Sequence, residues 1–202
     1  MKYDIYLVGV GGQGVLTIGD LITEAAARQR IPVSFYPTKG MAQRGGAVKA
    51  RLRLGREFAG PNIPERGADL VIAMERSEAL KAVRFIKPGG DFVLFGHVWA
   101  PTAVMLGKED YPTLEQVREQ VQEAGGKMHY LAPKDLPLYE GGPVAANVYV
   151  LGAAVGHTPL GEILDQSEAA NLVQARWAKG AERNELAFQA GLGPMFEGER
   201  EF

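Results

Sequence analysis

The order of apolar and polar positions predicts a sheet built from short buried strands. Apolar runs at Ile5–Val8, Asp69–Met74 and Asp91–Phe95 stop abruptly at glycine or charged residues, which is typical of strands covered on both faces. A similar run at Ile31–Phe35 begins near a proline, which a strand start tolerates. Residues Ala47–Leu54 instead alternate, with lysine and arginine at every second position. That alternation predicts a strand with one exposed face.

Helical periodicity fills most of the intervals between these strands. Apolar residues of Val15–Arg28 recur at helical spacing with one core-facing side, and Val144–Val155 is apolar almost all round. Thr113 is a good N-cap for a helix that ends near Ala124, before two glycines. Further helices are expected at Glu75–Phe85, which ends before Lys87–Gly90, and at Ser167–Lys179 and Ala181–Gln189, and a last short strand at Met128–Leu131.

This succession predicts an α/β fold: a three-layer Rossmann-like open sheet, mostly parallel, with helices on both faces and a helical C-terminal part. The first strand, the glycine turn, the helix at Val15 and the strand at Ile31 should form a right-handed βαβ unit. Residues Tyr36–Gly46 are expected to be a loop. One domain is expected over 1–190, followed by a poorly ordered tail over 191–202, which is rich in glycine and glutamate.

The amino-acid composition excludes several classes of function for this chain. The chain has 202 residues and a formal net charge of −2, so nucleic acid is not an expected partner. It contains no cysteine, which excludes disulfides, a cysteine nucleophile and a cysteine-ligated cluster within this chain. Its three histidines have no metal-ligand spacing, and we expect no metal site. No apolar stretch suits a signal peptide or a membrane span, so a cytoplasmic location is expected.

A glycine-rich turn follows the first strand. Gly9, Gly11 and Gly14 satisfy G-x-G-x-x-G at the entry to a helix, a context in which backbone amides and the helix dipole favour an anion. The alternative is a turn whose glycines serve only close packing of strand and helix. The acidic residue that a dinucleotide fingerprint needs about twenty residues later is missing, whereas Lys39 stands nearby. NADP or coenzyme A therefore suits this turn better than NAD.

A second glycine-containing segment, Lys39–Gly46, has the sequence KGMAQRGG. The guanidinium of Arg44 could bind a carboxylate or phosphate in bidentate fashion, and the amide of Gln43 could donate and accept. Met41 would be a flexible apolar contact. Alternatively, Arg44 is an exposed charge and the glycines merely turn the chain.

These two segments carry a resemblance to the gamma domain or subunit of 2-oxoacid:acceptor (ferredoxin) oxidoreductases. The resemblance continues through Ala68–Ala73 and Asn147–Ala153 and covers residues 3 to about 190. The MAQRGG sequence looks most like that of the small (beta) subunit of indolepyruvate:ferredoxin oxidoreductase. The resemblance implies one subunit of an enzyme that oxidatively decarboxylates an aryl 2-oxoacid with coenzyme A and ferredoxin, and that is inactive without its partner.

The resemblance also implies how the cofactors are divided. Thiamine diphosphate, magnesium and the iron–sulfur clusters are expected on a large partner subunit, ferredoxin is the electron acceptor of the complex, and coenzyme A is possible at the subunit junction. We assign no catalytic residue to this chain. The candidate ligand-contacting residues are Gly9, Gly11, Gly12, Gln13, Gly14, Thr38, Met41, Gln43, Arg44, Gly45, Gly46 and Asn147. Two other functions stay open: a stand-alone NADP-binding reductase and a non-catalytic binding module that forms a homodimer.

Overall fold

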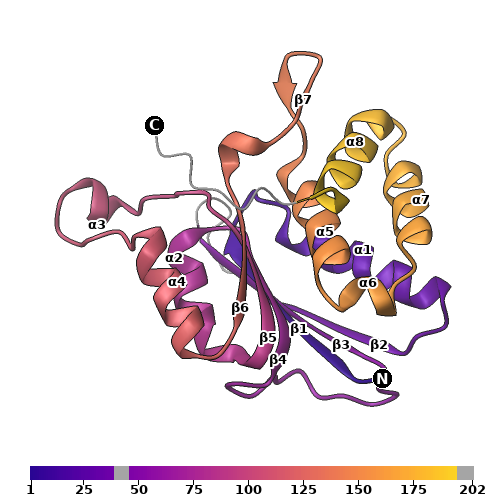
Figure 1. The fold of residues 1–202 in the computed structure, drawn as a ribbon, viewed down its shortest axis with the longest axis horizontal. Helices are drawn as coiled ribbons and strands as arrows, with labels where there is room; N and C mark the ends of the chain where they lie inside the picture. Colours follow the sequence, from indigo (N-terminus) through magenta and orange to yellow (C-terminus); the bar gives the residue numbers. More distant parts are fainter. Residues whose placement is uncertain (39–45, 195–202) are drawn as a thin grey trace.

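A six-stranded sheet forms the centre of the protein in the computed structural model, which describes residues 1–38 and 46–194 (Figure 1). The strands lie side by side in the order β2-β3-β1-β4-β5-β6. Their bounds are β1 Tyr3–Val10, β2 Val33–Thr38, β3 Ala47–Leu54, β4 Ala68–Ala73, β5 Ile86–Phe95 and β6 Lys127–Leu131. A separate hairpin of β7 (Leu138–Tyr139) and β8 (Gly142–Pro143) projects from one end.

The central sheet is mostly parallel, as predicted. Strands β1, β4, β5 and β6 pair in parallel with one another, whereas β3 is antiparallel to both of its neighbours. Strands β1 and β2 run in the same direction and are connected by α1, as in the predicted βαβ unit, but they do not pair with each other. Strand β3 lies between them and pairs with β1 over its whole length, from Val10 opposite Ala47 to Tyr3 opposite Leu54.

Helices cover both faces of the sheet, so the three-layer prediction is confirmed (Figure 1). One face carries α1 (Val15–Arg28), α5 (Ala146–His157), α6 (Leu160–Ile163), α7 (Gln166–Arg176) and α8 (Ala181–Leu192). The other carries α2 (Arg76–Ala82), the 3-10 turn η1 (Val83–Phe85) and α4 (Leu114–Glu123). A short helix α3 (Thr102–Met105) lies in a segment that extends away from the body.

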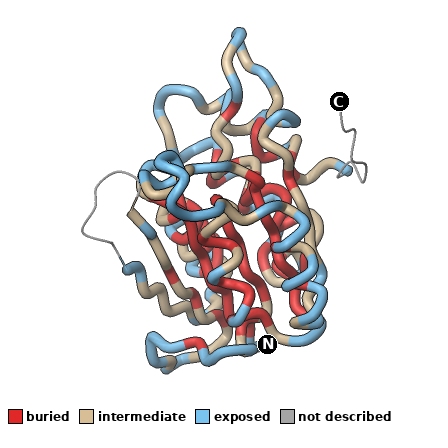
Figure 2. The backbone as a smooth tube through the Cα atoms, turned by 90° about the vertical axis from the view of Figure 1, so that its left-hand side faces the viewer, coloured by how far each residue is buried: buried red, intermediate tan, exposed pale blue. Residues whose placement is uncertain are grey.

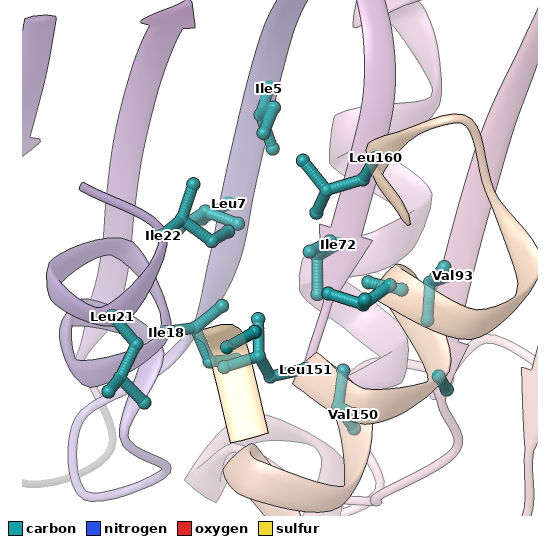
Figure 3. Packing of buried hydrophobic residues seen from close by; sticks show 14 of the residues in the cluster. Ile5, Leu7, Ile18, Leu21, Ile22, Ile72, Val93, Val150, Leu151 and Leu160 are labelled. Atoms are coloured by element: carbon teal, nitrogen blue, oxygen red, sulfur yellow. The ribbon is translucent and has the colours of Figure 1, made fainter. Parts of the chain in front are cut away.

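Alternation along the strands divides the core into two parts. In β1, Ile5 and Leu7 face α1 and α5, whereas Tyr6 and Val8 face α2. In the first part, Ile18 of α1 and Leu151 of α5 pack over the strands (Figure 3). Buried positions are concentrated in the strands and on the sheet-facing sides of the helices (Figure 2). Burial of these side chains supplies the main stabilising term of the fold.

Several predicted boundaries differ from the observed ones. The predicted loop over Tyr36–Gly46 starts too early, since Tyr36–Thr38 belong to β2, and Lys87–Gly90 lie within an irregular start of β5. The helix expected to start at Glu75 begins one residue later, because Glu75 is its N-cap and accepts a hydrogen bond from the Glu78 amide. Helix α8 extends through Leu192, beyond the expected start of the tail, and the rest of that tail from residue 195 lies outside the described residues.

Two of the histidines have structural partners. His129 Nε2 lies 2.8 Å from Asp91 Oδ1, and His157 Nε2 lies 2.8 Å from the Gly193 carbonyl oxygen. Within residues 1–38 and 46–194, no group of three or more His, Asp or Glu side chains could hold a metal ion. In the same ranges, none of the helices combines the length and apolar character needed to span a bilayer.

Candidate anion-binding site

The glycine-rich turn lies where the helical connections of two neighbouring strands diverge. Helix α1 follows β1 onto one face of the sheet, and α2 follows the adjacent parallel strand β4 onto the other. In open α/β sheets, ligands bind beyond the carboxyl ends of the strands at such a divergence. The topology therefore makes the carboxyl ends of β1 and β4 the candidate position for a ligand-binding site.

Close packing and backbone conformation both require glycine in this turn. A Cβ on Gly9 would lie 2.9 Å from Met74 Cβ and 2.8 Å from Val15 Cγ2, so a side chain there would clash. Gly12 and Gly14 have φ angles of +99° and +74°, in the region that L side chains rarely adopt. Gly12 is exposed, with open space where its side chain would be. The two interpretations of the turn are thus compatible: Gly9 is required for close packing of strand and helix, whereas Gly12 is exposed and could approach a ligand.

Gln13 braces the turn through its own carboxamide. Its Oε1 accepts a hydrogen bond from the Val10 amide at 2.9 Å, and its Nε2 donates to the Met74 carbonyl at 2.9 Å. The side chain therefore ties the end of β1 to the residue after β4. With both carboxamide atoms engaged, Gln13 supports the site by holding its backbone in place.

The turn also touches the end of the second glycine-containing segment. The Gly11 amide donates a hydrogen bond to the Gly46 carbonyl at 2.9 Å, and Val10 pairs with Ala47 in the sheet. The Gly11 amide is therefore committed to the protein. Met41, Gln43, Arg44 and Gly45 lie outside the described residues. The structure places Gly46, the described end of the second segment, next to the glycine-rich turn.

Asn147, which is distant in sequence, contacts the glycine-rich turn at Gly14. It lies in the first turn of α5, and a Cβ placed on Gly14 would be 2.4 Å from Asn147 Nδ2. The N-terminus of α5 therefore meets the N-terminus of α1. The amides of the first turn of a helix have no intrahelical acceptor and carry the positive end of the helix dipole.

The two helices that meet here have no side-chain cap, unlike α2, α4 and α7. Thr113 caps α4 and Asp165 caps α7, each accepting a bond from a first-turn amide. Neither α1, after Gly14, nor α5, after Ala145, has a side-chain cap or an acidic residue in its first turn. Two positively polarised backbone ends thus converge on one corner with no side-chain anion to neutralise them. This arrangement suits a carboxylate or phosphate.

Thr38 is farther from this corner than the other candidates. It ends β2, opposite Lys49 of β3, and Lys49 in turn pairs with Val8 of β1. At the usual spacing of strands, Thr38 is two strands or about 10 Å from β1. Thr38 is exposed, so it could reach only the outer part of an extended ligand.

Sequence reasoning missed a buried carboxylate next to this corner. Glu75 follows Met74 and is fully buried, and it accepts hydrogen bonds from the hydroxyl of Ser77, the Tyr111 hydroxyl and the Glu78 amide. The Trp99 amide also lies 3.4 Å from Glu75 Oε1. The Glu75 carboxylate thereby fastens the segment 97–112 to the carboxyl end of β4. The only sequence signal was its position as an acidic residue between a buried strand and a helix.

The segment 97–112, which Glu75 holds to β4, carries several aromatic and apolar side chains at its surface. The guanidinium of Arg76 lies 5.1 Å from the ring centre of Tyr111, and the His97 and Trp99 ring centres are 6.5 Å apart. Trp99, Met105 and Leu106 are exposed. These side chains form an exposed, partly apolar surface on the segment that Glu75 holds to the carboxyl end of β4.

Fold and site together define an open α/β domain in which the uncapped N-termini of α1 and α5 meet at a glycine-rich turn, at the topological switch point of the sheet. The chain belongs to the pyruvate ferredoxin/flavodoxin oxidoreductase family, whose pattern matches residues 4–193. It is 32% identical to indolepyruvate oxidoreductase subunit IorB of Methanothermobacter thermautotrophicus, over 98% of this chain and all of that protein. It is 36% identical to the subunit of the same name from Thermococcus kodakarensis, over 78% of each chain.

Solved structures share the fold. Pyruvate oxidoreductase subunit PORC of Thermotoga maritima superposes with a TM-score of 0.68 at 20% identity, covering 95% of each chain. The gamma subunit of a keto/oxoacid ferredoxin oxidoreductase from Geobacter sulfurreducens gives a TM-score of 0.64 at 21% identity, over 94% of this chain and 96% of that one. A 2-oxoglutarate:ferredoxin oxidoreductase from Magnetococcus marinus, solved with 2-oxoglutarate, coenzyme A and succinyl-CoA, gives 0.58 at 20% identity, over 94% of this chain and 30% of its own.

Proposed function

We propose that this chain is the small, gamma-type subunit of a 2-oxoacid:ferredoxin oxidoreductase of the indolepyruvate type. The observation that carries this proposal is the end-to-end match to an indolepyruvate oxidoreductase subunit at 32% identity. The complex would oxidatively decarboxylate an aryl 2-oxoacid to its acyl-CoA and pass the electrons to ferredoxin. The chain alone would be inactive, because the reaction requires the cofactors of the whole complex.

The cofactors divide between the subunits according to the donors that each can offer. This chain has no cysteine, so cysteine-ligated iron–sulfur clusters have to reside on the larger partner. Thiamine diphosphate and magnesium are assigned there too, as the resemblance to the family implies. When bound to the partner, thiamine diphosphate supplies the electron sink for decarboxylation.

The part played by this chain is to receive an anionic group at the subunit junction. The first-turn amides of α1 and α5 converge at Gly14 and Asn147, and they would hold a phosphate or carboxylate without any charged side chain. Gly46 anchors the segment that contains Arg44 at the same edge, so its guanidinium would complete the pocket. Coenzyme A, with its several phosphates, is the ligand that this chemistry fits best.

Calorimetry on the assembled complex tests this proposal. Coenzyme A is titrated into the complex of this chain with its cysteine-rich partner, comparing wild type with Arg44→Ala. Loss of one bidentate charge-assisted contact should weaken binding about 10- to 100-fold. Arg28→Ala is the matched control, because Arg28 lies at the far end of α1 and pairs with Glu24 on the surface. Unchanged affinity and turnover in Arg44→Ala would refute the role of Arg44.

Two further observations separate this function from the others considered. Co-purification of the chain with a large thiamine- and cluster-binding protein supports the subunit assignment, whereas a chain that only pairs with itself contradicts it. Tight binding of NADPH by the isolated chain, seen as enhanced nicotinamide fluorescence, would also contradict it. That result would favour a self-contained reductase.

A further inference from the structure

The exposed apolar side chains of this protein are concentrated in the segment 97–112. Eight large apolar residues are exposed within residues 1–38 and 46–194, and four of them lie between positions 98 and 106. They are Val98, Trp99, Met105 and Leu106, of which Met105 is 70% and Leu106 63% exposed. Single exposed apolar residues are ordinary on a protein surface, whereas several in one short segment indicate a site of interaction.

Helix α3, which lies within this segment, buries none of its side chains. None of Thr102–Met105 is buried, and the N-cap Pro101 supplies no side-chain hydrogen bond. A helix this short is not stable by itself in water. The segment extends away from the sheet (Figure 1), so the described part of the chain leaves the apolar side of α3 uncovered.

Polar contacts with a single carboxylate hold the two ends of the segment. The Trp99 amide lies 3.4 Å from Glu75 Oε1, and the Tyr111 hydroxyl donates a hydrogen bond to the same oxygen. Glu75 itself is fully buried. Residues 99–111 therefore leave and return at one point, as in an Ω-loop. A loop whose ends are fixed in advance loses less conformational entropy when it binds a partner.

The base of the segment lies at the edge of the sheet where the subunit junction is proposed. Glu75 comes shortly after the carboxyl end of β4, and β4 pairs in parallel with β1, whose carboxyl end leads into the glycine-rich turn. A partner that closes over the turn therefore meets this segment at the same edge.

The shape of the segment determines which kind of partner fits it. Because the segment projects from the domain, its apolar side chains form a convex surface that needs a concave one opposite it (Figure 1). A symmetric dimer would bring the same surface of two copies together. Two projecting segments would then leave much of their apolar area in water, so a different protein with an apolar groove fits better.

We infer that residues 98–106 form a docking arm that inserts into an apolar groove of the larger, thiamine- and cluster-binding subunit. The inference rests on the proposed function, which supplies that partner. Trp99 and Met105 are the principal anchors, since tryptophan and methionine are enriched in the buried centres of interfaces. Glu75 and Tyr111 are positioning residues that hold the base of the arm.

Isothermal titration of the purified large subunit into this chain tests the docking arm. Met105→Asp and Leu106→Asp should each weaken binding at least about tenfold, because a buried anchor of an interface contributes this much or more. The Tm of each isolated variant should equal that of wild type, since both side chains are exposed in the chain alone. Phe58→Asp is the matched control, and it should leave binding unchanged. Phe58 is 94% exposed in the connection that follows β3 at the opposite edge of the sheet, where Leu54 pairs with Tyr3.

Hydrogen exchange provides a second measurement that needs no substitution. In the complex with the large subunit, the amides of residues 102–106 should exchange at least about tenfold more slowly than in the isolated chain. The amides of residues 57–60 should keep their rate. Unchanged exchange over 102–106, or wild-type affinity in both arm variants, overturns the docking arm and leaves the proposed function standing.

Two further outcomes separate the docking arm from the proposed function. A wild-type chain that binds no large subunit contradicts the proposed function itself, and the docking arm with it. Self-association of the wild-type chain in light scattering, abolished by Met105→Asp, would assign the arm to a second copy and overturn the inference.

Discussion

Asn147 lies directly against Gly14, so closely that a Cβ on Gly14 would be 2.4 Å from Asn147 Nδ2 and 3.0 Å from Asn147 Cβ. The contact joins the start of α5 to the start of α1, two helices from distant parts of the chain. Glycine is therefore required at position 14 for two reasons, its φ of +74° and the approach of the asparagine.

Gly14→Ala should destabilise the protein. The left-handed conformation costs an L residue about 1–2 kcal/mol, and the overlap with Asn147 adds to it. The free energy of unfolding, measured by urea denaturation, should fall by about 2–4 kcal/mol.

Gly12→Ala is the control for the conformational part, because Gly12 has φ +99° but open space around its missing side chain. In the double variant Gly14→Ala with Asn147→Ala, the steric overlap is relieved and only the conformational cost remains. Its loss of unfolding free energy should therefore be close to that of Gly12→Ala. If Gly14→Ala and Gly12→Ala cost the same, Asn147 does not restrict the turn.

Gln13→Ala should loosen the connection between the ends of β1 and β4. It removes the acceptor of the Val10 amide and the donor to the Met74 carbonyl, at about 1–3 kcal/mol for each buried group left unpaired. Urea denaturation measures the total, and Gln13→Glu tests the donor role of the carboxamide. Glutamate can still accept from Val10 but turns a carboxylate oxygen toward the Met74 carbonyl, so a loss at least as large as that of Gln13→Ala is expected. Wild-type stability in both variants would contradict the bracing role.

Asn147→Asp should change stability and ligand affinity in opposite directions. A carboxylate placed at two uncapped helix N-termini stabilises them, by about 0.3–1 kcal/mol. The same negative charge neutralises the helix N-termini and repels an anionic ligand, so coenzyme A should bind the assembled complex at least about tenfold more weakly. Thermal denaturation and calorimetry measure the two effects. A parallel loss of both would mean that the variant is simply misfolded, and unchanged affinity would place the anion elsewhere.

Tyr111→Phe should release the segment 97–112 while the sheet remains intact. The ring stays under Arg76, but the buried carboxylate of Glu75 loses the hydroxyl that donates to it. Loss of one donor to a buried charge costs about 1–3 kcal/mol, concentrated in this segment. Hydrogen exchange should accelerate over 97–112 and stay slow in β4. Tyr139→Phe, which removes a hydroxyl bonded to Glu182 in the exposed hairpin, should leave that segment unchanged.

The N-cap of α7 should make stability depend on pH in the acid range. The Ser167 hydroxyl, then the Glu168 amide, lower the pKa of Asp165 in the folded chain. Its contribution is therefore fully present above the pKa of the unfolded chain and is lost as pH falls through the lower folded value. Ser167→Ala should weaken this dependence in a series of Tm measurements from neutral to acid pH. The same Tm profile for both proteins would show that the Ser167 hydroxyl does not lower the pKa of Asp165.

The elements themselves could be predicted from sequence because their signals are local. The alternation of Ala47–Leu54 and the capping box at Thr113 with Gln116 depend on neighbours a few residues away, and both are observed. The glycine turn is equally local, since strand, turn and helix follow one another without interruption. The family resemblance, which depends on the same short segments, is confirmed by the match over residues 4–193.

Tertiary structure alone decided which elements became neighbours. The sequence contains no signal that β3 separates β1 from β2, because any strand with one apolar face can pair with several others, and total burial selects among them. The same holds for Asn147 beside Gly14 and for Glu75 with Tyr111, each pair brought together by packing across the sheet edge. Hydrophobic periodicity and helix caps depend on residues within one turn or one strand. A binding site formed by the N-termini of two helices that are distant in sequence exists only once the whole core has formed.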